Sequence, residues 1–61
     1  MNKKLKQMRI DQSLSQSQVA KHANISERQY RRIELEDQAP NVNTAILIAE
    51  ILNTTVENLF K

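Results

Sequence analysis

The chain has 61 residues, with no cysteine, one histidine and a net charge of +2 at neutral pH. A chain of this length buries only about 60% of the surface it exposes when unfolded, and its composition excludes disulfides, thiolate metal sites and a zinc site. It has no apolar run near the roughly 20 residues of a membrane-spanning helix, and its N-terminus lacks the apolar segment of a signal peptide, so we expect residues 1–61 to be a single soluble domain in the cytoplasm.

The charges are distributed unevenly along the chain. Residues 1–32 hold eight lysines and arginines against two acidic residues, a balance of +6, whereas residues 33–61 hold one lysine against five acidic residues, a balance of −4. Such a division is typical of a protein that presents one basic face to a polyanion. A lysine-rich N-terminus is also often only a solubilising end, so the charge alone leaves both interpretations open.

Residues 2–12 are predicted to form a first amphipathic helix. Its inward side carries Leu5, Met8 and Ile10. Arg9 shares that side and needs a partner there, because burying a charge is costly unless it is paired. Leu14 closes the first connection and is expected to be buried.

The segment that follows predicts a helix, a tight turn and a second helix. Ser15 and Ser26 are N-cap residues, and each is followed three residues later by a glutamine, Gln18 and Gln29, which is the capping-box pattern. Asn24 is the residue best suited to the left-handed turn between the helices, because the chain has no glycine. Residues 16–23 place a narrow stripe of small side chains inward: Val19, Ala20 and Ala23.

Residues 27–35 are predicted to form a third helix with two different sides. At about 100° per residue, Tyr30 and Ile33 face the core, and the opposite side carries Arg28, Arg31 and Arg32. Arginine pairs bidentately with N7 and O6 of guanine, so an anchored helix with an outward arginine face suits the major groove of DNA. The alternative interpretation is a solvated charged face.

Two more helices complete the prediction. Pro40 disfavours helical geometry at the residue before it, and Asn41 caps the most apolar segment, residues 42–52. The core-facing side chains of that segment are Val42, Ala45, Ile48, Ala49 and Leu52. Thr55 caps a short last helix at residues 56–60, so the fold class is all-α with five helices and no strand.

The residues in this order resemble the helix-turn-helix domain of the Cro and phage-repressor type, the Xre family. The resemblance runs from Leu5 to Phe60 and rests on LKQMR, LSQSQVAKHANIS, RRIE, Pro40 and ILIAEILNTTVENLF at the right spacing. It implies a compact five-helix bundle of the lambda-repressor type whose third helix reads double-stranded DNA. By position, it implies base contacts from Glu27, Arg28 and Arg32. It implies backbone contacts from Gln16, Ser17, Ser26, Gln29, Arg31 and Gln38, and a structural ion pair between Arg9 and Glu34.

The chain departs from the family pattern at several places. The glycine usual in the turn after the second helix is Asn24, and the glycine usual after the third helix is Glu36, where a left-handed conformation costs roughly 1 kcal/mol. Glu36 and Asp37 also make the following loop acidic, which weakens the expectation of phosphate contacts from it. Tyr30 replaces an aliphatic residue, and its hydroxyl is expected to reach water or a phosphate.

The function implied is sequence-specific DNA binding by a transcriptional repressor, acting as a dimer on a pseudo-palindromic operator. Surplus apolar residues mark a candidate dimer surface: Leu47, Ile51 and Phe60. The alternative is that these residues complete the core of the monomer. A second function is a protein-interaction module such as an antitoxin, which would use the same apolar surface.

An enzyme is not expected, because the chain has no nucleophile and base set, no carboxylate pair and no glycine-rich phosphate loop. His22 is expected on the surface with no carboxylate placed to pair with it. We therefore expect no cofactor, no metal, no small-molecule substrate and no membrane partner.

Overall fold

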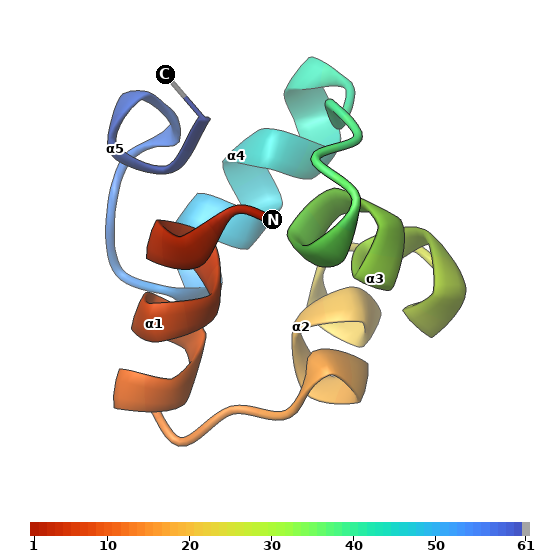
Figure 1. Ribbon diagram of the computed structural model, residues 1–61. Helices are drawn as coiled ribbons and strands as arrows, with labels where there is room; N and C mark the ends of the chain where they lie inside the picture. Colours follow the sequence, from red (N-terminus) through yellow and green to blue (C-terminus); the bar gives the residue numbers. More distant parts are fainter. Residues whose placement is uncertain (61) are drawn as a thin grey trace.

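The computed structural model describes residues 1–60, and within them the chain forms five α-helices and no strand (Figure 1). The helices are α1 (Lys3–Asp11), α2 (Gln16–His22), α3 (Glu27–Leu35), α4 (Val42–Ile51) and α5 (Val56–Phe60). Each predicted helix is present, and the predicted boundaries are within one residue of those observed. The predicted all-α fold class with five helices is confirmed.

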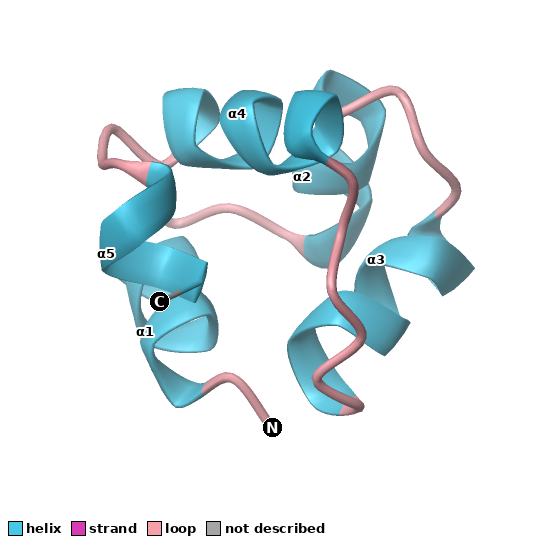
Figure 2. Ribbon diagram, turned by 90° about the horizontal axis from the view of Figure 1, so that it is seen from above, coloured by secondary structure: helices cyan, strands magenta, loops and turns pink. Residues whose placement is uncertain are grey.

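The helices surround one apolar core. Helix α2 packs against α3 and α4, α4 packs against α5, and α1 packs against α3. In Figure 1, α1 and α5 lie at one end of the molecule and α2 and α3 at the other, and Figure 2 shows α4 between them. This arrangement leaves one side of α3 without a covering helix.

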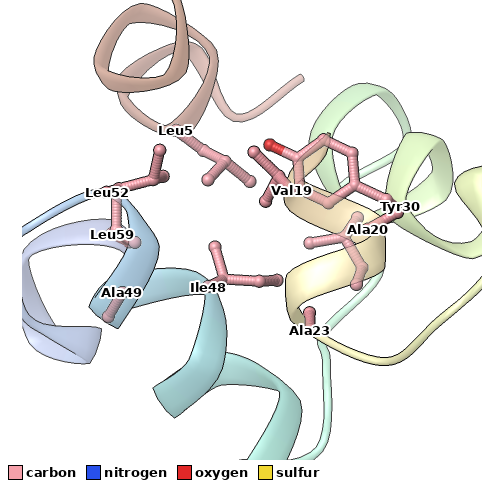
Figure 3. Close-up of a cluster of buried hydrophobic side chains, with 10 residues drawn as sticks. Leu5, Val19, Ala20, Ala23, Tyr30, Ile48, Ala49, Leu52 and Leu59 are labelled. Atoms are coloured by element: carbon pink, nitrogen blue, oxygen red, sulfur yellow. The ribbon is translucent and has the colours of Figure 1, made fainter. Parts of the chain in front are cut away.

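Side chains from all five helices meet in the core (Figure 3). The buried apolar cluster consists of Leu5, Val19, Ala20, Ala23, Tyr30, Ile33, Ile48, Ala49, Leu52 and Leu59. The small residues of α2 lie where α2 crosses its neighbours, because alanine lets two helices approach closely. Every predicted core residue of α2 and α3 is buried.

Two predicted core residues lie on the surface instead. Ile10 is 49% exposed and Val42 is 74% exposed. Ile10 belongs to the last turn of α1 and Val42 to the first turn of α4, and each side chain lies on the exposed side of its helix. Leu14 is half-buried and packs against the core rather than lying within it.

Side-chain caps begin the helices as the sequence predicts. Ser15 and Ser26 each accept a hydrogen bond from the backbone N–H of the glutamine three residues later, and both capping boxes are complete. Asn41 caps α4 through its side chain, which accepts from the N–H of Thr44 at 2.8 Å. Thr55 caps α5 as predicted, accepting from the N–H of Asn58 at 3.1 Å. A single cap of this kind contributes about 1 kcal/mol, so each of the short helices gains a defined start.

Asn2 is the cap of α1 and not part of the helix. Its Oδ1 accepts from the backbone N–H of Leu5 at 3.0 Å. Its backbone N–H donates to the carbonyl of Glu34 and its Nδ2 donates to the carbonyl of Leu59, both at 2.8 Å. Asn2 thereby joins the start of α1 to the last turns of α3 and α5.

Left-handed residues follow four of the helices, although the chain has no glycine. They are Ser13, Asn24, Asp37 and Asn53, with φ between 56° and 61°. Asn24 occupies the predicted turn. The expectation for Glu36 is wrong, because Glu36 has φ −111° and ends α3, and Asp37 takes the left-handed conformation one residue later.

Candidate nucleic-acid interface

Helix α3 divides into a buried side and an exposed side. Its buried residues are Tyr30, Ile33 and Glu34. The outer side carries Glu27, Arg28, Arg31, Arg32 and Leu35. Both capping groups at its start are in place, so the exposed side chains project from a fixed backbone.

Arg28 and Arg32 are the free cations of this face. They lie four residues apart, one helical turn along α3, and both are exposed. Neither guanidinium forms a hydrogen bond or an ion pair with another side chain among residues 1–60. Their donor groups are therefore available to a ligand outside the domain.

Arg31 is engaged within the domain. Its Nη2 donates to Oε2 of Glu27, one turn before it on α3, and its Nε donates to Oε1 of Gln16 at 3.3 Å. The amide of Gln16 continues inward, where Nε2 donates to Oε2 of Glu34 at 3.0 Å. A connected set of polar side chains thus runs from the surface of α3 to the interior.

Glu34 is the buried centre of this network, with an exposed fraction of 0%. Oε1 accepts from Nε of Arg9 and from the hydroxyl of Tyr30, both at 2.8 Å. Oε2 accepts from Nη2 of Arg9 at 3.2 Å, as well as from Gln16. The expectation that the Tyr30 hydroxyl reaches water or a phosphate is wrong, because it donates to this carboxylate.

Arg9 also ties the network to the loop before α2. Its Nη1 donates to the carbonyl of Leu14 at 2.8 Å. No buried side-chain nitrogen or oxygen lacks a partner in the part of the chain that the structure describes. The charge buried at Glu34 is therefore paired and fully hydrogen-bonded, the condition under which a buried ion pair is tolerated.

The environment shifts the pKa values of all three core groups. Burial would raise the pKa of Glu34, but hydrogen bonds from Arg9, Gln16 and Tyr30 outweigh it and hold that pKa below its usual value. The hydrogen bond to Glu34 raises the pKa of Arg9. Burial, together with the hydrogen bond to Glu34, raises the pKa of Tyr30. At neutral pH the network contains an ionised carboxylate, a guanidinium and a neutral phenol.

Comparison with protein families agrees with this geometry. A family model described as helix-turn-helix matches residues 5–59. The chain belongs to the Cro/C1-type helix-turn-helix family. In this family, α2 and α3 correspond to the two helices of the helix-turn-helix motif. Members of this helix-turn-helix family are DNA-binding regulators of transcription. No curated protein and no solved structure matches the chain.

The remaining residues implied by the helix-turn-helix resemblance lie on both sides of the α2–α3 turn and beyond α3. Ser17 is exposed in the first turn of α2, and Gln38 is exposed in the loop after α3. Ser26 and Gln29 are occupied by capping, since the backbone N–H of Ser26 donates to Oε1 of Gln29 at 3.2 Å. The Nε2 group of Gln29 takes no part in that contact.

The acidic loop after α3 is partly neutralised inside the domain. Asp37 forms an ion pair with the N-terminal amine of Met1, with 2.6 Å between the amine nitrogen and Oδ2. The repulsion of phosphates expected from this loop would therefore come mainly from Glu36, which has no such ion-pair partner among residues 1–60.

His22 has a partner that the sequence did not reveal. Its Nε2 lies 2.9 Å from Oε1 of Glu50, and both side chains are exposed. The expectation that no carboxylate is placed to pair with His22 is therefore wrong. The contact joins α2 to α4 on the surface, where such a pair contributes at most about 1 kcal/mol.

The candidate dimer residues are less exposed than the sequence suggests. Leu47, Ile51 and Phe60 are partly buried and pack against the core, which agrees with the alternative that they complete the monomer. The more exposed apolar residues of α4 are Val42 and Ile46, which is 49% exposed. They are four residues apart and share one side of the helix.

One further feature lies outside the α3 face. A surface pocket of about 590 Å³ between α1 and α5 is lined by Lys3, Lys4, Gln7, Met8, Asp11 and Asn58. Residues 1–60 contain no group of three or more His, Cys, Asp or Glu residues arranged to hold a metal ion. None of the described helices is long and apolar enough to cross a membrane.

The sequence did not reveal the network that links Gln16, Glu27 and Arg31. One signal was available, because Glu27 and Arg31 have the i, i+4 spacing of a helical ion pair. The Gln16 contacts depend on how α2 crosses α3, and the sequence alone does not give that angle.

Proposed function

We propose that this domain binds double-stranded DNA in a sequence-specific manner and represses transcription, with α3 in the major groove. The observation that carries the proposal is the pair of exposed arginines, Arg28 and Arg32. They project one turn apart from a helix whose other side is fixed by the buried carboxylate of Glu34. A merely solvated face does not require such an anchor.

The proposed base contacts come from three residues of α3. Arg28 and Arg32 each present a free fork of N–H donors, which matches N7 and O6 of guanine. Glu27 lies in the first turn of α3 and is the acceptor of the set. These residues therefore favour a half-site that contains at least two guanines.

The proposed backbone contacts surround this face. They come from Gln16, Ser17, Ser26, Gln29, Arg31 and Gln38. Gln16 already donates one Nε2 hydrogen to Glu34, so its second hydrogen would bind the phosphate. Such contacts set the position of the protein on the duplex and carry no sequence information of their own.

A dimer is part of the proposal because one domain covers only a half-site. The dimer surface would be formed by α4 and α5, with Leu47, Ile51 and Phe60 at its edge and the more exposed Ile46 beside them. Sedimentation tests this part separately. A monomer at high protein concentration, in the presence and absence of operator, would rule out the dimer and leave the reading of a half-site unaffected.

A protein-interaction function, such as that of an antitoxin, is the second candidate. The observation that favours it is the exposed position of Val42 and Ile46 on α4. A partner that co-purifies with the wild type and is lost on Val42→Asp would support it. Unchanged DNA binding by that variant would show that the two surfaces are separate.

Selection of bound sequences from random duplex DNA, repeated over a series of salt concentrations, tests the proposal. We expect an enriched motif with inverted half-sites about one helical turn apart. Weak binding without sequence preference, lost steeply as salt rises, would reduce the function to electrostatic attraction. That result would overturn the proposal.

A further inference from the structure

We propose that Glu27 accepts a hydrogen bond from the exocyclic amino group of a base, and that Arg31 is a positioning residue that orients Glu27 for this contact. The base we expect is cytosine, read at N4. This inference deepens the proposed function and rests on it, because it requires α3 to lie in the major groove.

A continuous chain of contacts fixes the Glu27 carboxylate to the interior. Arg31 holds Glu27 through Nη2 and is itself held by Gln16 through Nε at 3.3 Å. Gln16 donates to Glu34 at 3.0 Å, and Glu34 is fully buried. An exposed ion pair normally samples many rotamers, but this one is tied at one end to a rigid group.

The chemistry of a carboxylate defines what it reads. An ionised carboxylate accepts hydrogen bonds and donates none. In the major groove the donors are N4 of cytosine and N6 of adenine, and glutamate accepts from cytosine N4. Guanine N7 and O6 and thymine O4 are acceptors, so Glu27 would repel them.

Arg31 offsets the repulsion between the Glu27 carboxylate and the DNA phosphates. A bare carboxylate on a helix directed at phosphates is repelled, but the pair with Arg31 leaves no net charge at this turn. The start of a helix also favours a negative side chain. The ion pair with Arg31 and the position at the helix start together allow a carboxylate on an otherwise basic face.

The same contacts separate Arg31 from the two guanine readers. Its Nε hydrogen and one Nη2 hydrogen are already donated to Gln16 and Glu27, so the edge of the guanidinium that carries Nε and Nη2 is not free to bind O6 and N7 of one guanine. Arg28 and Arg32 keep this edge free. The Nη1 group of Arg31 stays open to a phosphate, which is compatible with the backbone contact proposed above.

The test measures base preference at every position of the selected operator for wild type, Glu27→Ala, Arg31→Ala and Arg31→Lys. We expect Glu27→Ala and Arg31→Ala to reduce preference at the same base pair by at least about fivefold, the low end for one good base contact. The double variant should lose no more preference than Glu27→Ala alone. Arg31→Lys keeps the charge but cannot hold Glu27 and Gln16 together, so it should lose part of the preference.

Lys21→Ala is the matched control for charge, because Lys21 is exposed on α2 and makes no contact in this network. It should leave every base preference unchanged. Circular dichroism of each variant checks the fold, which an exposed pair affects little.

Chemically modified operators identify the group that is read. N4-methylcytosine at the affected position, or N6-methyladenine if the base is adenine, removes the hydrogen that points into the groove. The modification of the base that is read should abolish the difference in binding between wild type and Glu27→Ala. The modification that has this effect identifies the base.

Two results would overturn the inference. One is an Arg31→Ala variant that binds all sequences more weakly with its base preferences intact, because Arg31 would then contact only phosphate. The other is a Glu27→Ala variant with unchanged preference at every position. In either case the wild type would still select a motif, which distinguishes this failure from failure of the proposed function.

Discussion

Tyr30 and Glu34 lie one turn apart on the buried side of α3, and the Tyr30 hydroxyl donates to Oε1 of Glu34 at 2.8 Å. The phenol therefore fills the core and also completes the coordination of a buried charge. The same carboxylate holds Arg9 of α1 and Gln16 of α2. Three helices are fixed relative to one another through this one group.

Removing the hydroxyl tests the weight of this contact. Tyr30→Phe keeps the ring and leaves one fewer donor on the carboxylate. A hydrogen bond to a charged group contributes about 1.5–3 kcal/mol, and we expect the free energy of unfolding to fall by that amount. Urea denaturation measures it, with Lys21→Ala as a surface control within about 0.5 kcal/mol of wild type. Equal stability of Tyr30→Phe and wild type would mean that the hydroxyl has no energetic role.

The depressed pKa of Glu34 predicts a loss of stability in acid. The unfolded chain has a normal glutamate, with a pKa of about 4.3, while the folded chain holds the carboxylate ionised to lower pH. Below about pH 4.3 the unfolded state therefore binds more protons. The stabilisation is fully present above that pH and is lost as the pH falls through the folded-state pKa.

Urea denaturation between pH 7 and pH 3 measures this effect. We expect the decline to be shallower in Tyr30→Phe, because that variant removes one of the hydrogen bonds that depress the pKa of Glu34. A free energy of unfolding that rises on acidification through this range would contradict the ionised state of Glu34.

Alkaline titration gives a second view of the same site. The chain has one tyrosine, so phenolate absorbance reports Tyr30 alone. Burial raises its pKa, whereas the unfolded chain titrates near pH 10, about the value of a free phenol. We expect the phenolate signal to appear only together with unfolding, as judged by circular dichroism. A phenolate signal near pH 10 in a chain that is still helical would show that Tyr30 is exposed.

The left-handed residue after α1 offers a stabilising substitution. Ser13 has φ 58° and is exposed. Glycine removes the steric cost of this conformation but adds freedom to the unfolded chain, so Ser13→Gly should stabilise by about 0.5–1 kcal/mol. Gln7→Gly, within α1, is the opposite control and should destabilise by about 1 kcal/mol. The thermal midpoints of the two variants should move in opposite directions, and a shift of both downward would refute the strain at Ser13.

The elements of this fold could be predicted because their signals are local. Ser15 and Ser26, each with a glutamine three residues later, mark the starts of α2 and α3, and Asn24 marks the turn between them. The errors arise where tertiary contacts decide. Val42 and Ile10 fit the apolar pattern, but their side chains lie on the exposed sides of their helices.

The interior of the site could be predicted only in part. The pairing of Arg9 with Glu34 follows from the family resemblance and is present in the structure. The position of the Tyr30 hydroxyl, the role of Gln16 and the pairing of Asp37 with the N-terminus depend on distances between helices. Those distances follow from packing, which a pattern along one chain does not encode.

Methylation interference on the selected operator tests the central claim most directly. Methylation of guanine N7 places a methyl group in the major groove, where Arg28 and Arg32 are proposed to bind. We predict that DNA bound by wild type is depleted of methylation at two guanines in each half-site. Arg28→Ala should restore tolerance at one of them and Arg32→Ala at the other. Identical methylation patterns in bound and free DNA would contradict the reading of guanine by α3.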